Sequence, residues 1–460
     1  MNERMERYFG NLRGREVLVL GLGVSNRPLV KLLLDHGAKV TGCDHAERGQ
    51  LDAQTLSLER AGLQLKLGEN YLSDLHGEVA FRTPGLHPGR PELQQLRKSG
   101  TRITSEMEAF FEVCPCPVLA VTGSDGKTTT TSLIAEILKQ AGKTVWVGGN
   151  IGRPLLPLAD RMTDTDVAVV ELSSFQLMDM ESSPHVAVVT NLAPNHLDVH
   201  RDMAEYVAAK QNVYRYQSEG DVAIFNADNA ITHGFCGNAH GTVKEFSRRG
   251  RPERGVYLED GVIYRTGETP EVILRQEEIF IPGIHNVENY MAAILAVEGL
   301  ASDEDIRTVA RNFRGVEHRI ELVREKDGVR YFNDSIASSP SRTIAGLRSF
   351  PEKLILIAGG YDKQIPYDAL GPEIVAHVKK LVLTGATASK IKRAVLESPG
   401  YRPEELEIAE VDDFYDAIRK AAALAVPGDV VMLSPASASF DRFPNFMVRG
   451  DAYKRTVMEL

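Results

Sequence analysis

Residues 118–130 read VLAVTGSDGKTTT, and this stretch decides the fold of the chain around it. Its apolar start predicts a buried strand over Pro117–Val121, and the pattern over Thr129–Gln140 predicts a helix. A strand, a glycine turn and a helix in that order direct backbone N–H groups and the positive helix end at one place, which favours phosphate binding. Lys127 can neutralise phosphate charge there, and the Thr128 hydroxyl can take a Mg²⁺ position.

The loop is shorter than the usual phosphate-binding loop. That pattern has a glycine five residues before Gly126, where this chain has Val121, and the first glycine is Gly123. The alternative to phosphate binding is a tight turn before an ordinary helix. The flanking strand and helix favour a nucleotide, for which the predicted contacts are Gly123, Ser124, Asp125, Gly126, Lys127, Thr128 and Thr129.

A similar but weaker pattern lies near the N-terminus. The apolar strand Val17–Leu20 runs into the turn Gly21–Gly23, and a second strand over Lys39–Cys43 ends at Asp44. This order is typical of the opening of a doubly wound sheet. Asn26 stands where the dinucleotide fingerprint has its third glycine, so the turn alone leaves nucleotide binding open.

The remaining apolar runs predict a series of α/β blocks. Runs at Val167–Val170, Val186–Val189 and Val222–Phe225 are continuous, as strands buried on both faces of a parallel sheet are. Residues 241–283 are more hydrophilic and predict a small antiparallel patch. Further strands at Lys353–Ala358, Lys380–Thr384 and Asp429–Leu433 alternate with helical patterns such as Asp412–Ala425.

We therefore predict an α/β fold of three serial α/β domains. The expected domains are a Rossmann-like domain at residues 1–105, a P-loop-type domain with a parallel sheet at 106–315, and a second Rossmann-like domain at 316–460. The length of 460 residues fits about three domains of roughly 150 residues each.

Composition narrows the functional classes. A net charge of −10 argues against a general nucleic-acid binder, which needs a basic face. Four scattered cysteines do not make a disulfide framework or a zinc site, and the Cys114-Pro-Cys116-Pro stretch is interpreted as a linker. No run approaches the ~18 apolar residues of a membrane span, and no signal peptide is visible. We expect a cytoplasmic protein, and a monomer, since nothing in the sequence requires a partner chain.

Several further motifs follow the loop in a fixed order. They are Glu171-Leu172-Ser173-Ser174-Phe175-Gln176-Leu177, Asn195-His196-Leu197-Asp198, Tyr206-Val207-Ala208-Ala209-Lys210, His285-Asn286-Val287-Glu288-Asn289, His318-Arg319, Asn333-Asp334-Ser335 and the segment from Ser434 to Gly450. With the short loop, this set resembles the Mur ligases of peptidoglycan synthesis, and most closely their D-glutamate-adding members. The resemblance covers all three blocks.

The resemblance implies an ATP-dependent amide ligase that activates a carboxylate as an acyl phosphate. The implied substrates are UDP-N-acetylmuramoyl-L-alanine, D-glutamate and ATP, with two Mg²⁺ ions. It implies catalytic roles for Lys127, Glu171, His196 and Lys210, and metal contacts from Thr128, Glu171, His196 and Lys210. Lys210 is expected to be carbamylated by CO₂, which turns a cation into an oxygen ligand. Without the resemblance, Glu171 could be a helix cap, His196 structural and Lys210 a solvated surface residue.

The resemblance also assigns the ligand contacts. For ATP it adds Asn289, Arg319 and Asp334 to the loop residues. For the UDP-linked substrate it implies Val24, Ser25, Asn26, Asp44, His45, Thr83, Gly85 and Asn150. For the incoming amino acid it implies Lys363, Ser439 and Phe446, although Lys363 could instead be a surface charge.

One position departs from the family pattern. Ile336 follows Asn333-Asp334-Ser335, where a lysine is usual, so either another cation such as Arg342 replaces it or the amino-acid specificity differs. Alternatives within the class are a ligase for L-glutamate, L-alanine or a diamino acid, and a folylpolyglutamate synthetase. A nicotinamide dehydrogenase would need the fingerprint that Asn26 interrupts. A nucleotide-binding regulator would be expected to lack Lys127, Glu171 or His196.

Overall fold

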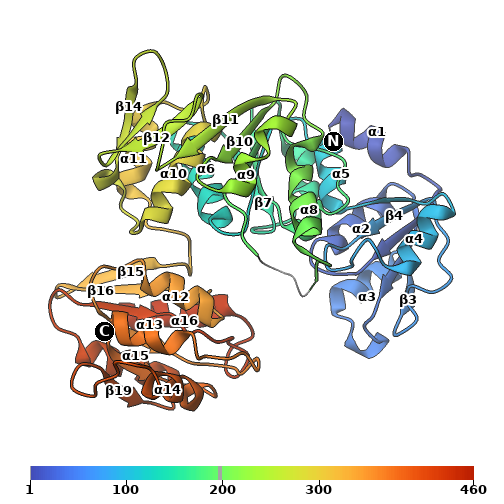
Figure 1. The fold of residues 1–460 in the computed structure, drawn as a ribbon. Coiled ribbons are helices and arrows are strands. Elements are labelled where there is room, and N and C mark those ends of the chain that lie inside the picture. The colour runs from blue at the N-terminus through green and yellow to red at the C-terminus, as the bar shows by residue number, and fades with distance from the viewer. Residues whose placement is uncertain (1, 195–198) are drawn as a thin grey trace. The chain divides into compact units, whose positions relative to one another are not determined.

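The computed structural model describes residues 2–194 and 199–460, and the chain divides into two compact units (Figure 1). The first unit comprises residues 1–278 and 287–311, and the second comprises residues 279–286 and 312–460. The described residues form three sheets, two in the first unit and one in the second. The predicted α/β class with largely parallel sheets is confirmed, and the three domain boundaries stay a prediction.

The first sheet is parallel, with strand order β3-β2-β1-β4-β5. Its strands are β1 (Glu16–Leu20), β2 (Lys39–Asp44), β3 (Gln64–Leu67), β4 (Val79–Arg82) and β5 (Arg102–Thr104), with helices α1 (Glu3–Gly10), α2 (Asn26–Asp35), α3 (Ala53–Arg60), α4 (Pro91–Lys98) and α5 (Glu106–Val113). The order reverses between β1 and β4. The turns after these two strands therefore flank the crevice where open α/β sheets bind ligands.

The second sheet has the order β14-β13-β12-β11-β10-β9-β6-β8-β7. Its strands are β6 (Val118–Thr122), β7 (Val145–Gly149), β8 (Val167–Glu171), β9 (Val186–Val189), β10 (Val222–Asn226), β11 (Thr242–Ser247), β12 (Gly255–Glu259), β13 (Val262–Arg265) and β14 (Glu271–Arg275). Strands β6 to β12 pair in parallel, and β12 to β14 pair antiparallel. The predicted antiparallel patch is present, but it continues this sheet instead of standing apart.

The helices of the second sheet include one that begins at the turn after β6 and one that carries Lys210. They are α6 (Lys127–Gln140), α7 (Ser174–Leu177), α8 (Met203–Arg215), α9 (Ala230–His233), α10 (Ile284–Ala296) and α11 (Asp303–Asn312). Helix α6 buries Leu133, Ile134, Ile137 and Leu138. Because these side chains anchor α6, its polar N-terminus stays directed at the turn that follows β6.

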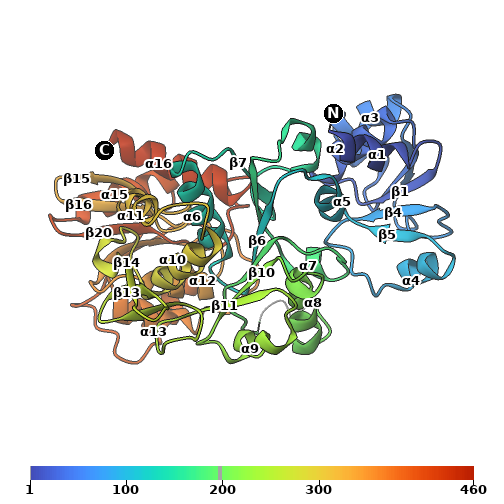
Figure 2. The same cartoon turned by 90° about the horizontal axis from the view of Figure 1, so that it is seen from above.

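The two sheets of the first unit share one hydrophobic core. Met5 and Phe9 of α1 belong to the same buried cluster as Phe110 and Val113 of α5, and Figures 1 and 2 show the two helices beside each other. Asn2 also donates from Nδ2 to the Ala159 carbonyl at 2.7 Å. Helix α1 therefore ties the first sheet to the second.

The segment predicted as a linker is part of this core. Cys114 and Cys116 are each 2% exposed, and their sulfur atoms lie 3.5 Å apart. Arg4 of α1 donates to the Cys114 carbonyl at 2.6 Å. The stretch does connect α5 to β6, as predicted, but its cysteines behave as small apolar core residues.

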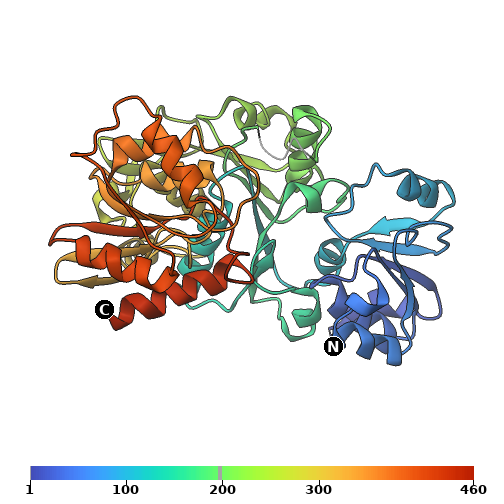
Figure 3. The same ribbon diagram turned by 90° about the horizontal axis from the view of Figure 1, so that it is seen from below.

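The second unit is built on a sheet of order β15-β16-β20-β17-β18-β19. Its strands are β15 (Glu321–Lys326), β16 (Val329–Asn333), β17 (Leu354–Ala358), β18 (Val378–Leu383), β19 (Glu407–Glu410) and β20 (Val430–Leu433), with helices α12 (Pro340–Leu347), α13 (Leu370–His377), α14 (Ala388–Leu396), α15 (Phe414–Leu424) and α16 (Phe446–Glu459). One core cluster takes residues from α12, α13 and α14, and another takes them from α15 and α16. Helices therefore cover both faces of the sheet, and Figure 3 shows α16 ending at the C-terminus.

Across residues 2–194 and 199–460, no helix combines the length and the apolar character needed to cross a membrane.

Candidate functional site

The turn between β6 and α6 depends on two glycines. Gly123 and Gly126 have φ values of 146° and 79°, in the region that favours glycine. A Cβ atom on Gly123 would lie 2.0 Å from Thr190 Oγ1, and one on Gly126 would lie 2.3 Å from Asn289 Oδ1. The loop is therefore held close to neighbouring side chains, in a conformation that places the first turn of α6 at the end of β6.

Lys127 folds back over this loop. Its Nζ atom donates to the carbonyl oxygens of Gly123 at 2.9 Å and Ser124 at 2.8 Å. Asn289 contacts the start of α6, since its Oδ1 atom accepts from Thr130 Oγ1 at 3.2 Å. The positive charge of Lys127 thus lies beside the helix N-terminus, where an anion would bind.

Glu171 is the centre of the polar cluster in the first unit. It ends β8, is 2% exposed, and accepts from Thr128 Oγ1 at 2.7 Å and from Asn150 Nδ2 at 2.8 Å. The Asn150 N–H also donates to the Glu171 carbonyl at 2.8 Å. Thr128, predicted to contact ATP and Mg²⁺, and Asn150, predicted to contact the UDP-linked substrate, therefore both bond to the Glu171 carboxylate.

Lys210 is buried beside the loop, although it lies in a helix where lysine usually faces solvent. It is 2% exposed, and its Nζ atom donates to Thr122 Oγ1 at 2.8 Å and to the Gly123 carbonyl at 3.1 Å. Burial, and then the nearby Lys127 charge, hold the pKa of Lys210 well below its usual value. A lowered pKa favours the neutral amine, which is the form that reacts as a nucleophile.

These residues fit the oxygen chemistry of Mg²⁺. The Thr128 hydroxyl and the Glu171 carboxylate already touch, and both are hard oxygen donors of the kind that Mg²⁺ prefers. Lys210 is close to the same loop, whereas His196 lies outside the described residues. The metal contacts predicted for Thr128, Glu171, His196 and Lys210 stay a prediction.

A cavity of about 280 Å³ lies where the first sheet meets the second. It brings together five of the residues predicted for the UDP-linked substrate, namely Val24, Ser25, Asn26, Thr83 and Asn150. It is also lined by Gly23, Arg82, Pro84, Ser105, Glu106, Met107, Gly149, Gly152, Pro154 and Gln176. The turns after β1 and β4 thus face the Asn150 loop, as the reversal of strand order implies.

Three residues predicted for the same substrate do not line this cavity. Asp44 accepts from the Leu22 N–H at 2.7 Å, so it braces the turn after β1. The His45 ring packs edge-on against Tyr71, with centroids 6.1 Å apart. Gly85 belongs to the Thr83 turn but is not among the residues around the cavity. Their predicted contacts would require a ligand that extends beyond the cavity.

Arg319 and Asp334 lie close together in the second unit. Asp334 is buried and accepts from Ser434 Oγ at 2.7 Å, and burial raises the pKa of this carboxyl to about 7, against the opposing effects of Ser434 and Arg319. Arg319 Nε is buried, and among the described residues it has no hydrogen-bond partner. A buried donor without an acceptor is costly, and an anion such as a phosphate would satisfy it.

The three residues predicted for the amino acid are all near the loops that end β17 and β20. Lys363 is exposed, while Ser439 is 2% exposed. The Tyr361 N–H donates to the Ala438 carbonyl at 2.9 Å, which joins their two segments. Phe446 begins α16, and its carbonyl accepts from Ser335 Oγ at 2.8 Å. The second unit therefore holds these positions on adjoining segments.

Arg342 lies next to the position where a lysine is usual. Its Nη1 atom donates to the Ile336 carbonyl at 3.2 Å, and its charge acts to lower the pKa of Asp334. The second unit thus carries a cation close to Ile336, although it comes from α12 and not from the Asn333-Asp334-Ser335 segment.

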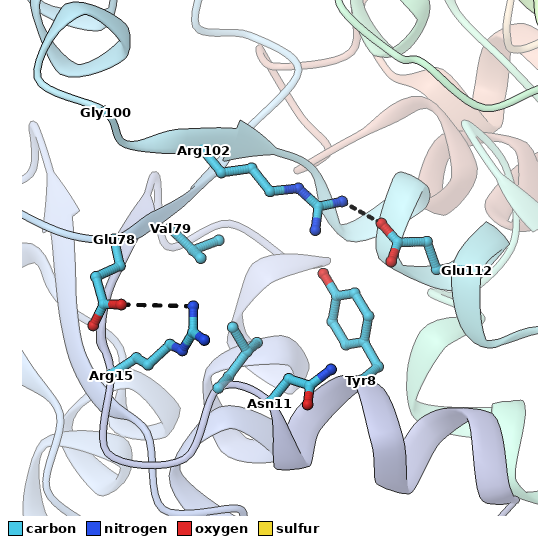
Figure 4. A pocket seen from close by; sticks show the side chains of 9 residues that line it. Tyr8, Asn11, Arg15, Glu78, Val79, Gly100, Arg102 and Glu112 are labelled. Atoms are coloured by element: carbon cyan, nitrogen blue, oxygen red, sulfur yellow. Dashed lines mark hydrogen bonds and ion pairs between the residues drawn. The ribbon is translucent and has the colours of Figure 1, made fainter.

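A larger cavity of about 650 Å³ contains none of the predicted site residues (Figure 4). It lies where β1, β4 and β5 begin, at the edge of the first sheet opposite the substrate turns. Its two arginines are already in ion pairs, Arg15 with Glu78 at 3.6 Å and Arg102 with Glu112. Ligands of α/β sheets bind at the other strand ends, so we assign no role in the reaction to this cavity.

Sequence reasoning missed two buried polar residues near the candidate site, Arg82 and Glu106, and it gave no role to Arg449, which stands in the Ser434–Gly450 motif. Arg82 and Glu106 line the cavity, and Arg449 donates to Ser335 Oγ at 3.0 Å and to the carbonyls of Ser437 and Ala438. Burial lowers the pKa of Arg449 to about 10. A charged residue at the end of an apolar strand was a signal for Arg82, but the carboxylate that pairs with it, Asp179, lies 97 residues away.

Comparison with known proteins agrees with this architecture. The Mur ligase middle domain matches residues 121–297, and the Mur ligase glutamate ligase domain matches residues 318–437. A UDP-N-acetylmuramoylalanine--D-glutamate ligase of Acetivibrio thermocellus is 50% identical over 461 residues, covering 99% of each chain. The enzyme of the same name from Clostridium botulinum (strain Alaska E43 / Type E3) is 45% identical over 461 residues, covering 100% of both chains.

The fold is also found among solved structures. The MurF ligase of Thermotoga maritima, solved in complex with ADP, superposes with a TM-score of 0.55 at 17% sequence identity. The superposition covers 100% of both chains. The domain matches and the full-length relatives together settle the family question. This chain belongs to the Mur ligase family.

Proposed function

We propose that this chain is a ligase that adds D-glutamate to UDP-N-acetylmuramoyl-L-alanine, using ATP and an acyl-phosphate intermediate. The observation that carries the proposal is the identity of 50% and 45%, over essentially the whole length, to enzymes named for that reaction. The arrangement of Lys127, Thr128, Glu171 and Lys210 around one loop supports it, because these groups suit phosphoryl transfer.

The first step makes a carboxylate reactive. An oxygen of the substrate carboxylate attacks the γ-phosphorus of ATP, the β–γ bond breaks, and ADP leaves. Two anions approach each other in this step, so positive charge must be in place beforehand. Lys127 and the N-terminus of α6 supply fixed positive charge at the loop. Mg²⁺ held by Thr128 and Glu171, with His196 and Lys210, would neutralise further phosphate charge.

The second step forms the amide. The amine of the incoming amino acid attacks the acyl carbon, the carbon–oxygen bond to phosphate breaks, and phosphate and a proton leave. The buried Arg319 Nε donor supports the contact with ATP phosphate proposed for Arg319, together with Asp334. Asn289, which accepts a hydrogen bond from Thr130 in the first turn of α6, is proposed to lie near the adenine.

We propose that Lys210 is carbamylated. A neutral amine attacks CO₂, and burial, which lowers the pKa of Lys210, favours that neutral form. The product would carry a carboxylate beside Thr122 and Gly123 in place of a buried cation. Enzyme equilibrated with ¹³C-bicarbonate should show a carbamate carbon signal by NMR that is missing from Lys210→Arg. A signal of equal strength in that variant would refute this assignment.

The 280 Å³ cavity is proposed to hold part of the UDP-linked substrate. The turn of Val24, Ser25 and Asn26, together with Thr83 and Asn150, would contact it there. Asp44, His45 and Gly85 are proposed to contact a part that extends past the cavity. Asn150 donates a hydrogen bond to Glu171, the proposed metal ligand. A substrate that contacts Asn150 would therefore also affect the position of Glu171.

For the amino acid we propose Lys363, Ser439 and Phe446, with Arg342 replacing the usual lysine. The hydrogen bond from Arg342 to the Ile336 carbonyl supports this replacement. A free, mostly buried state for all four cysteines agrees with action in the cytoplasm, and we propose that the enzyme acts there as a monomer.

Phosphate release from ATP tests the function. The enzyme is incubated with UDP-N-acetylmuramoyl-L-alanine and, one at a time, D-glutamate, L-glutamate, L-alanine and a diamino acid. Release that requires D-glutamate is the expected result. Phosphate release with another amino acid would support a ligase of different amino-acid specificity. No phosphate release with any of the amino acids would refute the substrate assignment.

A further inference from the structure

Arg82 is a completely buried arginine at the boundary of the substrate cavity. It ends β4, its side chain is 1% exposed, and it lines the 280 Å³ cavity. A buried guanidinium is expensive unless its donors are satisfied, so its contacts show what the fold requires of it. Those contacts fall into two groups, on two different segments of the chain.

The first group is on the turn that follows β4. Arg82 Nη1 donates to the carbonyl oxygens of Thr83 and Pro84 at 3.2 Å each, and of Leu86 at 2.7 Å. Thr83 and Pro84 line the cavity, as the arginine does. One nitrogen atom therefore gathers three carbonyls of the turn and fixes its conformation at the cavity wall.

The second group is on the segment that follows Glu171. Arg82 Nη2 donates to the Phe175 carbonyl at 3.0 Å and to Asp179 Oδ1 at 2.5 Å, and Nε donates to Asp179 Oδ2 at 3.3 Å. This is the two-point arginine–carboxylate geometry that fixes orientation as well as distance. Phe175 lies in α7, four residues after Glu171, and Asp179 follows that helix, so the arginine holds α7 next to the strand that Glu171 ends.

The cavity is thus tied to Glu171 from two sides. On one side, Asn150 lines the cavity and donates to Glu171 Oε1 at 2.8 Å. On the other side, Arg82 joins the Thr83 turn to the segment carrying Phe175 and Asp179. A shift of either segment would alter the distance between a substrate in the cavity and the carboxylate beside the ATP loop.

We propose that Arg82 is a positioning residue that holds the substrate turn in register with Glu171. The inference rests on the proposed function, because it concerns the alignment of the UDP-linked substrate with the phosphoryl-transfer site. Loss of this register raises the KM for the UDP-linked substrate and lowers kcat, since a misplacement of about 1 Å can cost roughly 100-fold in rate. The KM for ATP is unaffected, because the loop contacts of Lys127 and Thr128 do not involve Arg82.

Arg97 provides a matched control. It donates to the same carboxylate, Asp179 Oδ2, at 2.8 Å, and to the Pro88 carbonyl at 3.1 Å. It is about a third exposed, 34% for the side chain, and it does not line the cavity. Arg97→Met therefore removes an arginine from Asp179 while leaving the Thr83 turn and the Phe175 contact in place.

The experiment compares wild type, Arg82→Lys, Arg82→Met and Arg97→Met by steady-state phosphate release at a temperature where all are folded. For both Arg82 variants we expect a KM for the UDP-linked substrate raised at least tenfold and a lowered kcat, with the KM for ATP within twofold of wild type. Arg97→Met should keep all three constants within twofold. Lysine keeps the charge but cannot make the two-point contact, so Arg82→Lys covers a failure of Arg82→Met to fold.

Hydrogen exchange of the free enzyme gives a second readout that needs no substrate. The amides of residues 83, 85, 86 and 172–176 should exchange faster together in Arg82→Lys and keep wild-type rates in Arg97→Met. Unchanged exchange and unchanged KM in Arg82→Lys would overturn the inference, as would equal changes in Arg97→Met. Failure of the proposed function appears separately, as wild-type enzyme that releases no phosphate with any amino acid, and the exchange result then decides the inference alone.

Discussion

Replacement of Lys127 by methionine should nearly abolish turnover while leaving the fold intact. The change keeps most of the side chain and removes the ammonium group whose charge lies over the Gly123 and Ser124 carbonyls. A unit charge about 4 Å from a phosphate oxygen is worth about 4 kcal/mol at an effective dielectric constant of about 20. Since about 1.4 kcal/mol corresponds to tenfold in rate, we expect kcat to fall about 1,000-fold.

The same change has a small cost in stability. Two hydrogen bonds to carbonyls are lost, each worth about 1 kcal/mol, so the melting temperature should fall by only a few degrees. Phosphate release at saturating substrates and thermal unfolding measure the two effects. Lys139→Met is the control, because Lys139 lies in the last turn of the same helix and pairs with Glu136 at the surface. Activity within tenfold of wild type in Lys127→Met would refute the role given to its charge.

Three further outcomes follow from contacts in each unit. Asn150→Ala removes a charge-assisted hydrogen bond to Glu171 and a cavity contact, so the KM for the UDP-linked substrate should rise about tenfold or more in steady-state assays; an unchanged KM would remove Asn150 from the substrate site. Arg342→Ala should lower turnover with D-glutamate at least tenfold, and adding Ile336→Lys should restore part of that turnover. Unchanged turnover in Arg342→Ala would contradict the proposal that Arg342 takes the place of the usual lysine. Burial raises the pKa of Glu106 to about 7, compared with about 4.3 in the unfolded chain. The protonated Glu106 therefore stabilises the fold fully below about pH 4, and this stabilisation is lost as the pH rises to about 7. Urea unfolding of Glu106→Gln should therefore lose less stability between pH 5 and pH 8 than wild type does, and parallel curves would contradict the assignment.

The regular part of the fold could be predicted from local pattern. The strand predicted at Val186–Val189 has those bounds in the structure, because a continuous apolar run flanked by polar residues leaves few alternatives. Helix α6 begins at Lys127, two residues before the predicted start, because Gly126 takes a left-handed conformation and the helix follows at once. Boundaries of this kind depend on a single backbone angle, which residue type alone does not determine.

The candidate site was predictable only in part. Lys127 and Thr128 follow from a motif that is local in sequence, and the structure places them with Glu171. Nothing in the sequence around Lys210 indicates that it is buried, because a lysine in a helix usually faces solvent. Only the family resemblance identified it as a site residue. Arg82 was missed because its partner Asp179 lies 97 residues away, and tertiary contacts of that range leave no periodicity in the sequence.

Helix α1 implies an order of events during synthesis. Its apolar face packs against α5, and Asn2 bonds to the carbonyl of Ala159, which is 157 residues further along the chain. At roughly 5–20 residues per second, the ribosome needs about 8–30 s to make that stretch. Met5 and Phe9 therefore cannot complete their packing until α5 has been made, and the bond of Asn2 forms later still, once Ala159 has followed.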